Sequence, residues 1–160
     1  MTGDSEAKAK APPESVGLGY CSDPIRDADP RKLWKHMRTK ISRPQVFLPV
    51  TDVEALYVDG DGGGYTRRTM TFVGPGPMNG LVIKENIYAE ESTGEIRFVV
   101  LDDDGKETDV EIVNALLDHP TRIEYYRRAV GTRERLEWPA PKASAVGAIK
   151  KTVELAREDV

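Results

Sequence analysis

Apolar and polar residues alternate along the middle of the chain, from Thr51 to Val130, and short turn sequences interrupt the alternation. A period of two is typical of β-strands that bury one face. The turns, such as Asp103-Asp104-Gly105, are short enough for hairpins, so successive strands must pair in antiparallel fashion. The predicted strands lie around Val53–Tyr57 and at Tyr65–Val73, Leu81–Ala89, Glu95–Leu101, Thr108–Leu117 and Arg122–Val130.

A helical pattern follows these strands, between Trp138 and Arg157. Its apolar residues recur every three or four positions and form one apolar face. They are Ala145, Val146, Ile149, Val153 and Ala156. A helix of about 16 residues is roughly 24 Å long, which is enough to cross a sheet of six or seven strands. We therefore expect a cavity between this helix and the sheet, and we expect the functional site to lie in it.

Shorter elements precede the strands. The segment Ser15–Ile25 alternates in the manner of a half-buried strand. Asp29, followed by a proline, is typical of a helix start, and the apolar face that follows ends at Ile41. The proline-bounded segment Pro44–Pro49 predicts a second short helix or a turn. Residues 1–14 lack apolar periodicity and are predicted to form a disordered tail.

The order of these elements is strand, two short helices, six strands and a long helix. It predicts an α+β fold over residues 15–160, organised as a single domain. In this fold a curved antiparallel sheet of about seven strands wraps around the long C-terminal helix. The two short helices follow the first strand.

Composition narrows the functional classes. The chain of 160 residues has a net charge of −4, with acidic and basic residues mixed, which argues against nucleic acid as a partner. No stretch approaches the roughly 18 apolar residues of a membrane span. The single cysteine, Cys21, cannot form an internal disulfide and favours a reducing compartment such as the cytoplasm. His36 and His119 show no metal-ligand or triad spacing, so no metal or cofactor is expected.

Two segments carry a resemblance to a known family. They are residues 64–72 (GYTRRTMTF), which follow a glycine-rich turn, and residues 84–87 (KENI) in the next strand. With the element order, they resemble the helix-grip superfamily of START-like or SRPBCC proteins, and most closely its AtaL-like family. That family commonly has a glutamate where this chain has Thr69. The resemblance implies a helix-grip fold, and members similar to polyketide cyclases use one or two polar side chains of the cavity for proton transfer.

Two charged residues share a strand face with apolar ones. Arg68 alternates in phase with Met70 and Phe72, and Glu85 alternates in phase with Ile83 on the following strand. A buried arginine and a buried glutamate on adjacent strands need each other, because an unpaired buried charge costs several kcal/mol. We expect both side chains to project into the cavity. A purely structural ion pair, or two charges at the cavity mouth, is the open alternative.

Other candidates place single polar groups among apolar neighbours. Asn114 and Tyr125 have this pattern, which fits a ligand pocket with few oriented polar atoms, although a position at the sheet rim fits equally well. The predicted catalytic residues are Glu85, Arg68 and Tyr125. The predicted ligand-binding residues are Arg68, Met70, Phe72, Ile83, Glu85, Phe98, Ile112, Asn114, Val146 and Ile149.

Three functions remain open. The first is binding of a small, largely apolar organic ligand in the cavity. The second is an enzyme of the cyclase or lyase type, in which Glu85 or Tyr125 transfers a proton and Arg68 stabilises an enolate or phenolate. The third is a non-enzymatic accessory protein that binds a partner polypeptide or forms a homodimer, for example through a sheet edge.

Overall fold

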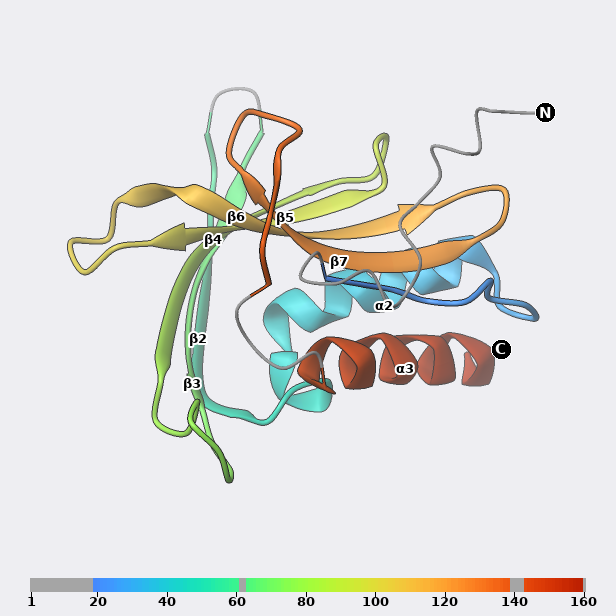
Figure 1. Cartoon of the computed structure of the whole chain (residues 1–160), viewed down its shortest axis with the longest axis horizontal. Coiled ribbons are helices and arrows are strands. Elements are labelled where there is room, and N and C mark those ends of the chain that lie inside the picture. The colour runs from blue at the N-terminus through green and yellow to red at the C-terminus, as the bar shows by residue number, and fades with distance from the viewer. Residues whose placement is uncertain (1–18, 61–62, 139–142, 160) are drawn as a thin grey trace.

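All eight strands found in the described residues form one antiparallel sheet (Figure 1). The computed structural model describes residues 19–60, 63–138 and 143–159. The strands are β1 (Tyr20–Cys21), β2 (Val50–Val58), β3 (Tyr65–Phe72), β4 (Val82–Glu90), β5 (Glu95–Leu101), β6 (Glu107–Leu117), β7 (Arg122–Ala129) and β8 (Arg135–Leu136). Their order across the sheet is β1-β7-β6-β5-β4-β3-β2, with β8 also paired to β7.

The predicted α+β class and the antiparallel meander from β2 to β7 are confirmed. The first strand is much shorter than the predicted Ser15–Ile25 within the described residues, where only Tyr20–Cys21 is strand. Beyond Cys21, isolated backbone hydrogen bonds from Ser22 N to Ile123 O at 2.9 Å and from Ile25 N to Thr121 O at 2.8 Å continue the contact, while Pro24 between them has no N–H to donate. The predicted tail, residues 1–14, lies outside the described residues. The short strand β8 was not predicted.

The N-terminal helices follow β1 as expected. Helix α2 spans Pro30–Ser42, and a 3-10 helix, η1, spans Pro44–Val46. The Asp29 side chain accepts a hydrogen bond from the Arg31 backbone N–H at 2.9 Å, which caps the first turn of α2. The buried face of α2 carries Leu33, Trp34, Met37, Lys40 and Ile41.

Helix α3 spans Ala143–Glu158. Trp138, which the apolar pattern placed at the helix start, has no regular structure, and residues 139–142 lie outside the described part of the chain. Figure 1 shows α2 and α3 on the same side of the sheet, and the two helices contact each other. The main apolar core fills the space between them and the sheet, and includes Leu33, Met37, Ile87, Ile96, Ile123, Ala148 and Ile149.

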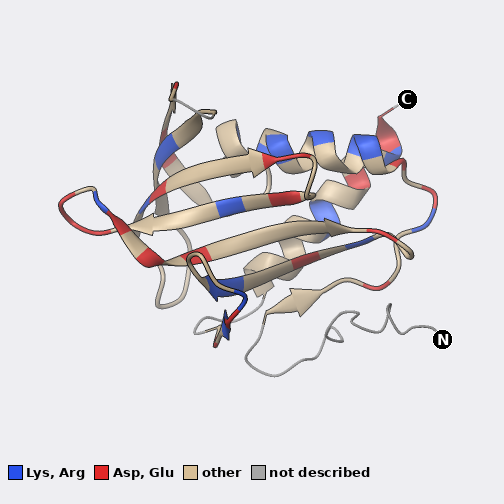
Figure 2. Cartoon of the chain, turned by 90° about the horizontal axis from the view of Figure 1, so that it is seen from above, with Lys and Arg blue, Asp and Glu red and all other residues tan. Residues whose placement is uncertain are grey.

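The opposite face of the sheet is covered by ion pairs. Glu111, almost fully buried, accepts hydrogen bonds from Arg97 and Arg128 at 2.8 Å each, and Arg135 pairs with Glu124. In Figure 2 acidic and basic positions are interspersed along the strands, so this face carries no single-sign field. Among the described residues no helix is long and apolar enough to cross a membrane.

Candidate functional site

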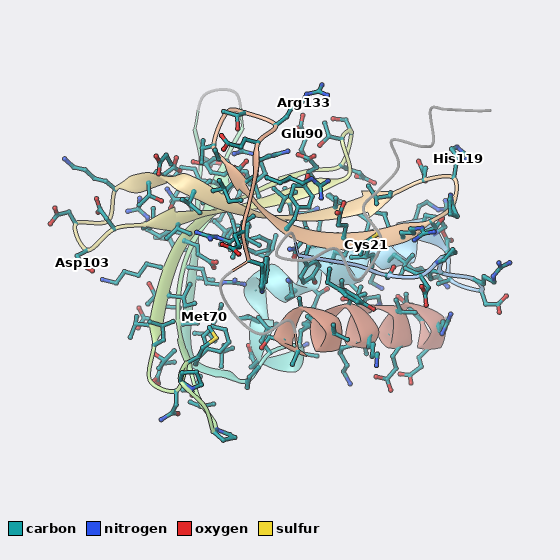
Figure 3. All side chains as sticks on the ribbon, viewed as in Figure 1. Cys21, Met70, Glu90, Asp103, His119 and Arg133 are labelled. Atoms are coloured by element: carbon teal, nitrogen blue, oxygen red, sulfur yellow. The ribbon has the colours of Figure 1, made fainter. Side chains whose placement is uncertain are left out.

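A cavity of about 250 Å³ lies on the helix side of the sheet. Strands β3 to β7 form its floor, the end of α2 and the start of α3 form its walls, and Met78 belongs to the loop between β3 and β4. Figure 3 shows Met70 on the side of β3 that faces the helices. The lining residues are Lys40, Leu48, Arg68, Met70, Phe72, Met78, Ile83, Glu85, Phe98, Ile112, Asn114, Tyr125, Arg127, Trp138, Ser144 and Ala145.

The size of this cavity sets the size of a possible occupant. A protein cavity of about 150 Å³ accommodates benzene, so about 250 Å³ has room for a single ring with a short substituent, or for a short chain. Two larger grooves of about 540 Å³ lie elsewhere, one between β1 and α3 and one between the end of α2 and the β3–β4 strands. Exposed residues line much of both grooves, whereas the smaller cavity collects buried polar groups.

The predicted pair of Arg68 and Glu85 is present in the cavity wall. The two residues lie directly opposite each other on β3 and β4, and Arg68 Nη2 donates to Glu85 Oε1 at 2.8 Å. Their exposed fractions are 2% and 5%. A charge this deeply buried is tolerated only when it is paired and hydrogen-bonded, which is the case here.

Arg68 also holds the end of α2. Its Nη1 donates to the backbone carbonyl oxygens of Lys40 at 2.9 Å and of Ile41 at 3.1 Å. The last carbonyl groups of a helix have no partner within the helix and carry its partial negative charge. The Arg68 guanidinium therefore satisfies both the Glu85 carboxylate and the C-terminus of α2, and it fixes this helix against the sheet.

Lys40 is one of seven cavity-lining residues that the sequence analysis did not assign to the site. Its Nζ donates to Asn114 Oδ1 at 2.6 Å and lies 4.2 Å from the Tyr125 ring centroid and 5.0 Å from the Phe98 ring centroid. Only 4% of the residue is exposed, and in the described part of the chain no carboxylate forms an ion pair with it. Aromatic faces and one amide oxygen thus take the place of water around this amino group.

This environment changes the acidity of Lys40. Burial disfavours the charged ammonium, and the nearby Arg68 charge disfavours it further, while the Glu85 carboxylate partly opposes them. Together these effects lower the pKa of Lys40 from 10.5 to about 7. Near neutral pH a much larger fraction of this side chain is therefore neutral amine than in an exposed lysine.

Three donors on cavity-lining residues lack a partner among the described residues, and each of these atoms is itself buried. They are the Tyr125 hydroxyl, Trp138 Nε1 and Arg68 Nε. Burial raises the pKa of Tyr125 well above its usual range, so the hydroxyl keeps its proton. The Thr152 hydroxyl of α3, which donates to Ala148 O at 2.9 Å, lies beside the Tyr125 hydroxyl and partly opposes this shift in pKa. Unsatisfied buried donors are rare, so three of them are an unusual feature of the cavity wall.

The structure brings most of the predicted site residues together. Nine line the cavity: Arg68, Met70, Phe72, Ile83, Glu85, Phe98, Ile112, Asn114 and Tyr125. Val146 and Ile149 are not among the lining residues, and Ile149 instead packs in the main core. Helix α3 meets the cavity only at its first turn, through Ser144 and Ala145. The functional roles assigned to the nine residues stay predictions.

The signal for Lys40 was present in the sequence. Lys40 lies three residues after Met37 and one before Ile41, so helical spacing places it on the apolar face of α2. Lysine at an interior position of an apolar helical face is an exception that marks a paired or functional group. Trp138 was assigned to the start of the C-terminal helix, and its place in the cavity wall had no local signal.

Comparison with family models gives no match, and comparison with curated proteins gives no relative. The site is therefore interpreted from its own geometry. Among the described residues no group of three or more His, Cys, Asp and Glu side chains is placed to hold a metal ion. Figure 3 shows His119 at the far end of the molecule from Met70, away from this cavity.

Proposed function

We propose that this protein binds a small, largely apolar organic ligand that carries a hydrogen-bond acceptor at one end. The observation that supports this proposal most directly is a largely apolar cavity whose wall also carries a few buried polar side chains, among them Lys40, Arg68 and Asn114. Pockets for small molecules have this composition, in which apolar walls supply affinity and a few polar groups fix orientation. The ligand would lie between β3–β7 and the first turn of α3.

The overall arrangement agrees with this proposal. A sheet that curves around a long C-terminal helix, with a cavity between them, is consistent with a helix-grip fold. The finer assignment to the START-like or SRPBCC superfamily, and to its AtaL-like family, is part of the proposal and rests on residues 64–72 and 84–87. In proteins of that superfamily the corresponding cavity receives organic ligands.

A matched pair of probes tests the proposal. Methyl benzoate and sec-butylbenzene share one heavy-atom skeleton, but only the ester offers acceptor oxygens. A satisfied buried hydrogen bond contributes about 1–2 kcal/mol, so methyl benzoate should bind roughly 5 to 30 times more tightly in calorimetric titration. Equal affinity of the two probes would refute the role of the buried polar groups in binding an acceptor, and absence of binding by both would refute the ligand-binding role of the cavity.

Two substitutions at the start of α3 provide the control. Ser144 lines the cavity, whereas Ala143 is exposed and does not line it. Ser144→Phe should fill the cavity from its rim and abolish binding of both probes, while Ala143→Phe should leave the affinities unchanged. Native mass spectrometry of the purified protein complements this test. A copurified apolar molecule would support ligand binding, and a copurified polypeptide would favour the accessory-protein hypothesis instead.

A further inference from the structure

We propose that the acceptor group of the ligand is the carbonyl of an aldehyde or ketone, and that this carbonyl condenses with Lys40 Nζ to form a reversible imine. This inference rests on the proposed ligand-binding function and names the substrate class of the same cavity. It follows from the placement of one amino group, its amide partner Asn114 and two aromatic rings on residues that line about 250 Å³ of space.

The position of the amino group is the first argument. Lys40 lines the cavity, and the one side-chain hydrogen bond that it makes to another described residue goes to Asn114 Oδ1. An exposed lysine of the same helix, Lys35, instead pairs with the Asp159 carboxylate at 2.8 Å. A carboxylate partner would stabilise the ammonium form, and Lys40 has none within ion-pair distance among the described residues. Its nitrogen is therefore available to a molecule in the cavity.

Protonation is the second argument, because only the neutral amine attacks a carbonyl. The charged or titratable side chains that face Lys40 come from three strands: Arg68 on β3, Glu85 on β4 and Tyr125 on β7. Glu85 is occupied by Arg68, and Tyr125 stays neutral, so the net field at Nζ disfavours the ammonium. A lysine that is desolvated beside another cation is a recognised form of activated nucleophile.

The condensation balances without any further reactant. The nitrogen lone pair forms a bond to the carbonyl carbon, and the C=O π electrons move to oxygen. Transfer of one proton from nitrogen to that oxygen gives a carbinolamine. Loss of the hydroxyl group with a second proton from nitrogen releases one water and leaves the C=N bond. No oxidant or reductant is consumed, and hydrolysis reverses the reaction.

The surrounding groups suit these steps. The Arg68 guanidinium places a positive charge in the cavity wall, which would stabilise the negative charge that develops on the carbonyl oxygen during attack. Asn114 Oδ1 accepts a hydrogen bond from the amine and so orients its lone pair. The faces of Phe98 and Tyr125 would stabilise a protonated imine in the same way that they stabilise the ammonium. Dry apolar walls retard hydrolysis of the imine.

Reductive trapping with benzaldehyde tests the inference. The full chain is incubated with benzaldehyde and sodium cyanoborohydride at pH 7, and the reduced adduct is counted by intact mass and located by peptide mapping. We expect one benzyl group per chain, at Lys40, with at least about tenfold preference over any exposed lysine, whose amine fraction at pH 7 is far smaller. Labelling spread over exposed lysines, with none at Lys40, would overturn the inference.

Variants and pH strengthen the test. Lys40→Arg and Lys40→Met should lose the adduct, whereas Lys150→Met, at an exposed position of α3, should keep it. In the wild-type protein the ratio of labelling at Lys40 to labelling at exposed lysines should be largest near pH 7 and should fall as pH approaches 10, where the exposed amines also lose their protons. If labelling at Lys40 had the same pH dependence as labelling at exposed lysines, the inference would be contradicted. This measurement uses the wild-type protein, so it does not depend on whether a variant folds.

The two proposals fail in different ways. If methyl benzoate binds but Lys40 remains unlabelled by benzaldehyde, the cavity binds acceptors and the imine is wrong. If neither methyl benzoate nor sec-butylbenzene binds, the ligand-binding function is wrong. Methyl benzoate is the suitable reference because an ester does not form an imine under these conditions.

Discussion

Replacing Glu85 with leucine removes the carboxylate that neutralises the buried Arg68 guanidinium. Leucine has a volume close to that of glutamate and leaves no large void, so the effect reports mainly on charge. Breaking a buried ion pair by removal of one partner costs about 3–5 kcal/mol, because the other charge remains desolvated. The total free energy of unfolding of a domain is about 5–15 kcal/mol, so Glu85→Leu should lose a large fraction of it.

Urea denaturation at equilibrium measures this loss of free energy of unfolding. A double-mutant cycle separates the interaction energy between Arg68 and Glu85 from the contributions of their other contacts. Arg68→Met combined with Glu85→Leu removes both charges and also the two hydrogen bonds from Arg68 to the end of α2. Each of those bonds contributes about 1 kcal/mol, so the double variant should lose only about 1–3 kcal/mol. It should therefore be more stable than Glu85→Leu alone.

An exposed ion pair supplies the control. Lys151 and Glu154 lie 3.5 Å apart on the solvent side of α3. Glu154→Gln should change the free energy of unfolding by less than about 0.5 kcal/mol. A loss below about 1 kcal/mol for Glu85→Leu, similar to this control, would show that water reaches Arg68 and would refute the description of the pair as dry.

Two further predictions concern pH and backbone geometry. The pKa of Lys40 is about 7 in the folded chain and 10.5 in the unfolded chain, so between these values the unfolded state binds more protons. Lys40 should therefore increase the free energy of unfolding by up to about 1.4 kcal/mol per pH unit as pH rises from 7 toward 10. The free energy of unfolding of the wild type minus that of Lys40→Met, measured by urea denaturation at pH 7, 8 and 9, should therefore rise with pH. Parallel pH profiles of the two proteins would contradict the lowered pKa of Lys40. Gly19→Ala should destabilise by about 1–3 kcal/mol in thermal unfolding, because Gly19 has a φ of 101° and an added Cβ would lie 2.1 Å from Tyr125 O. Gly147→Ala is its control, since open space surrounds that helical glycine and the change should stabilise by about 0.5–1 kcal/mol.

The sheet could be predicted from sequence because its signals are local. Strict alternation and turn residues identify β3 to β7, and hairpin-length connections leave antiparallel pairing as the only arrangement. Strand β8 could not be found in this way, since two residues, Arg135 and Leu136, carry no periodicity. The pairing of β1 with β7 joins segments about a hundred residues apart, and no local pattern encodes it.

The site was only partly predictable for a related reason. Alternation correctly placed Arg68 and Glu85 on one face of the sheet, because successive residues of a strand point to opposite faces and the two residues lie directly opposite each other on β3 and β4. Helices give weaker guidance, since an apolar face tells which residues are buried but not what they are buried against. Ile149 lies on the buried face of α3, as its spacing implies, but it packs in the core, and the cavity touches only the first turn of the helix.

Arg68 connects the fold to the proposed chemistry. By donating to the carbonyl oxygens of Lys40 and Ile41, it fixes the last turn of α2 over the sheet, and this places the Lys40 side chain beside Asn114. The same guanidinium charge helps to lower the pKa of Lys40, while Glu85 limits that effect. A structural ion pair and a ligand-site ion pair were opposed as alternatives at the sequence level. In this geometry one pair can do both, because the Arg68 guanidinium that anchors α2 is also the charge that helps to lower the pKa of the Lys40 amine.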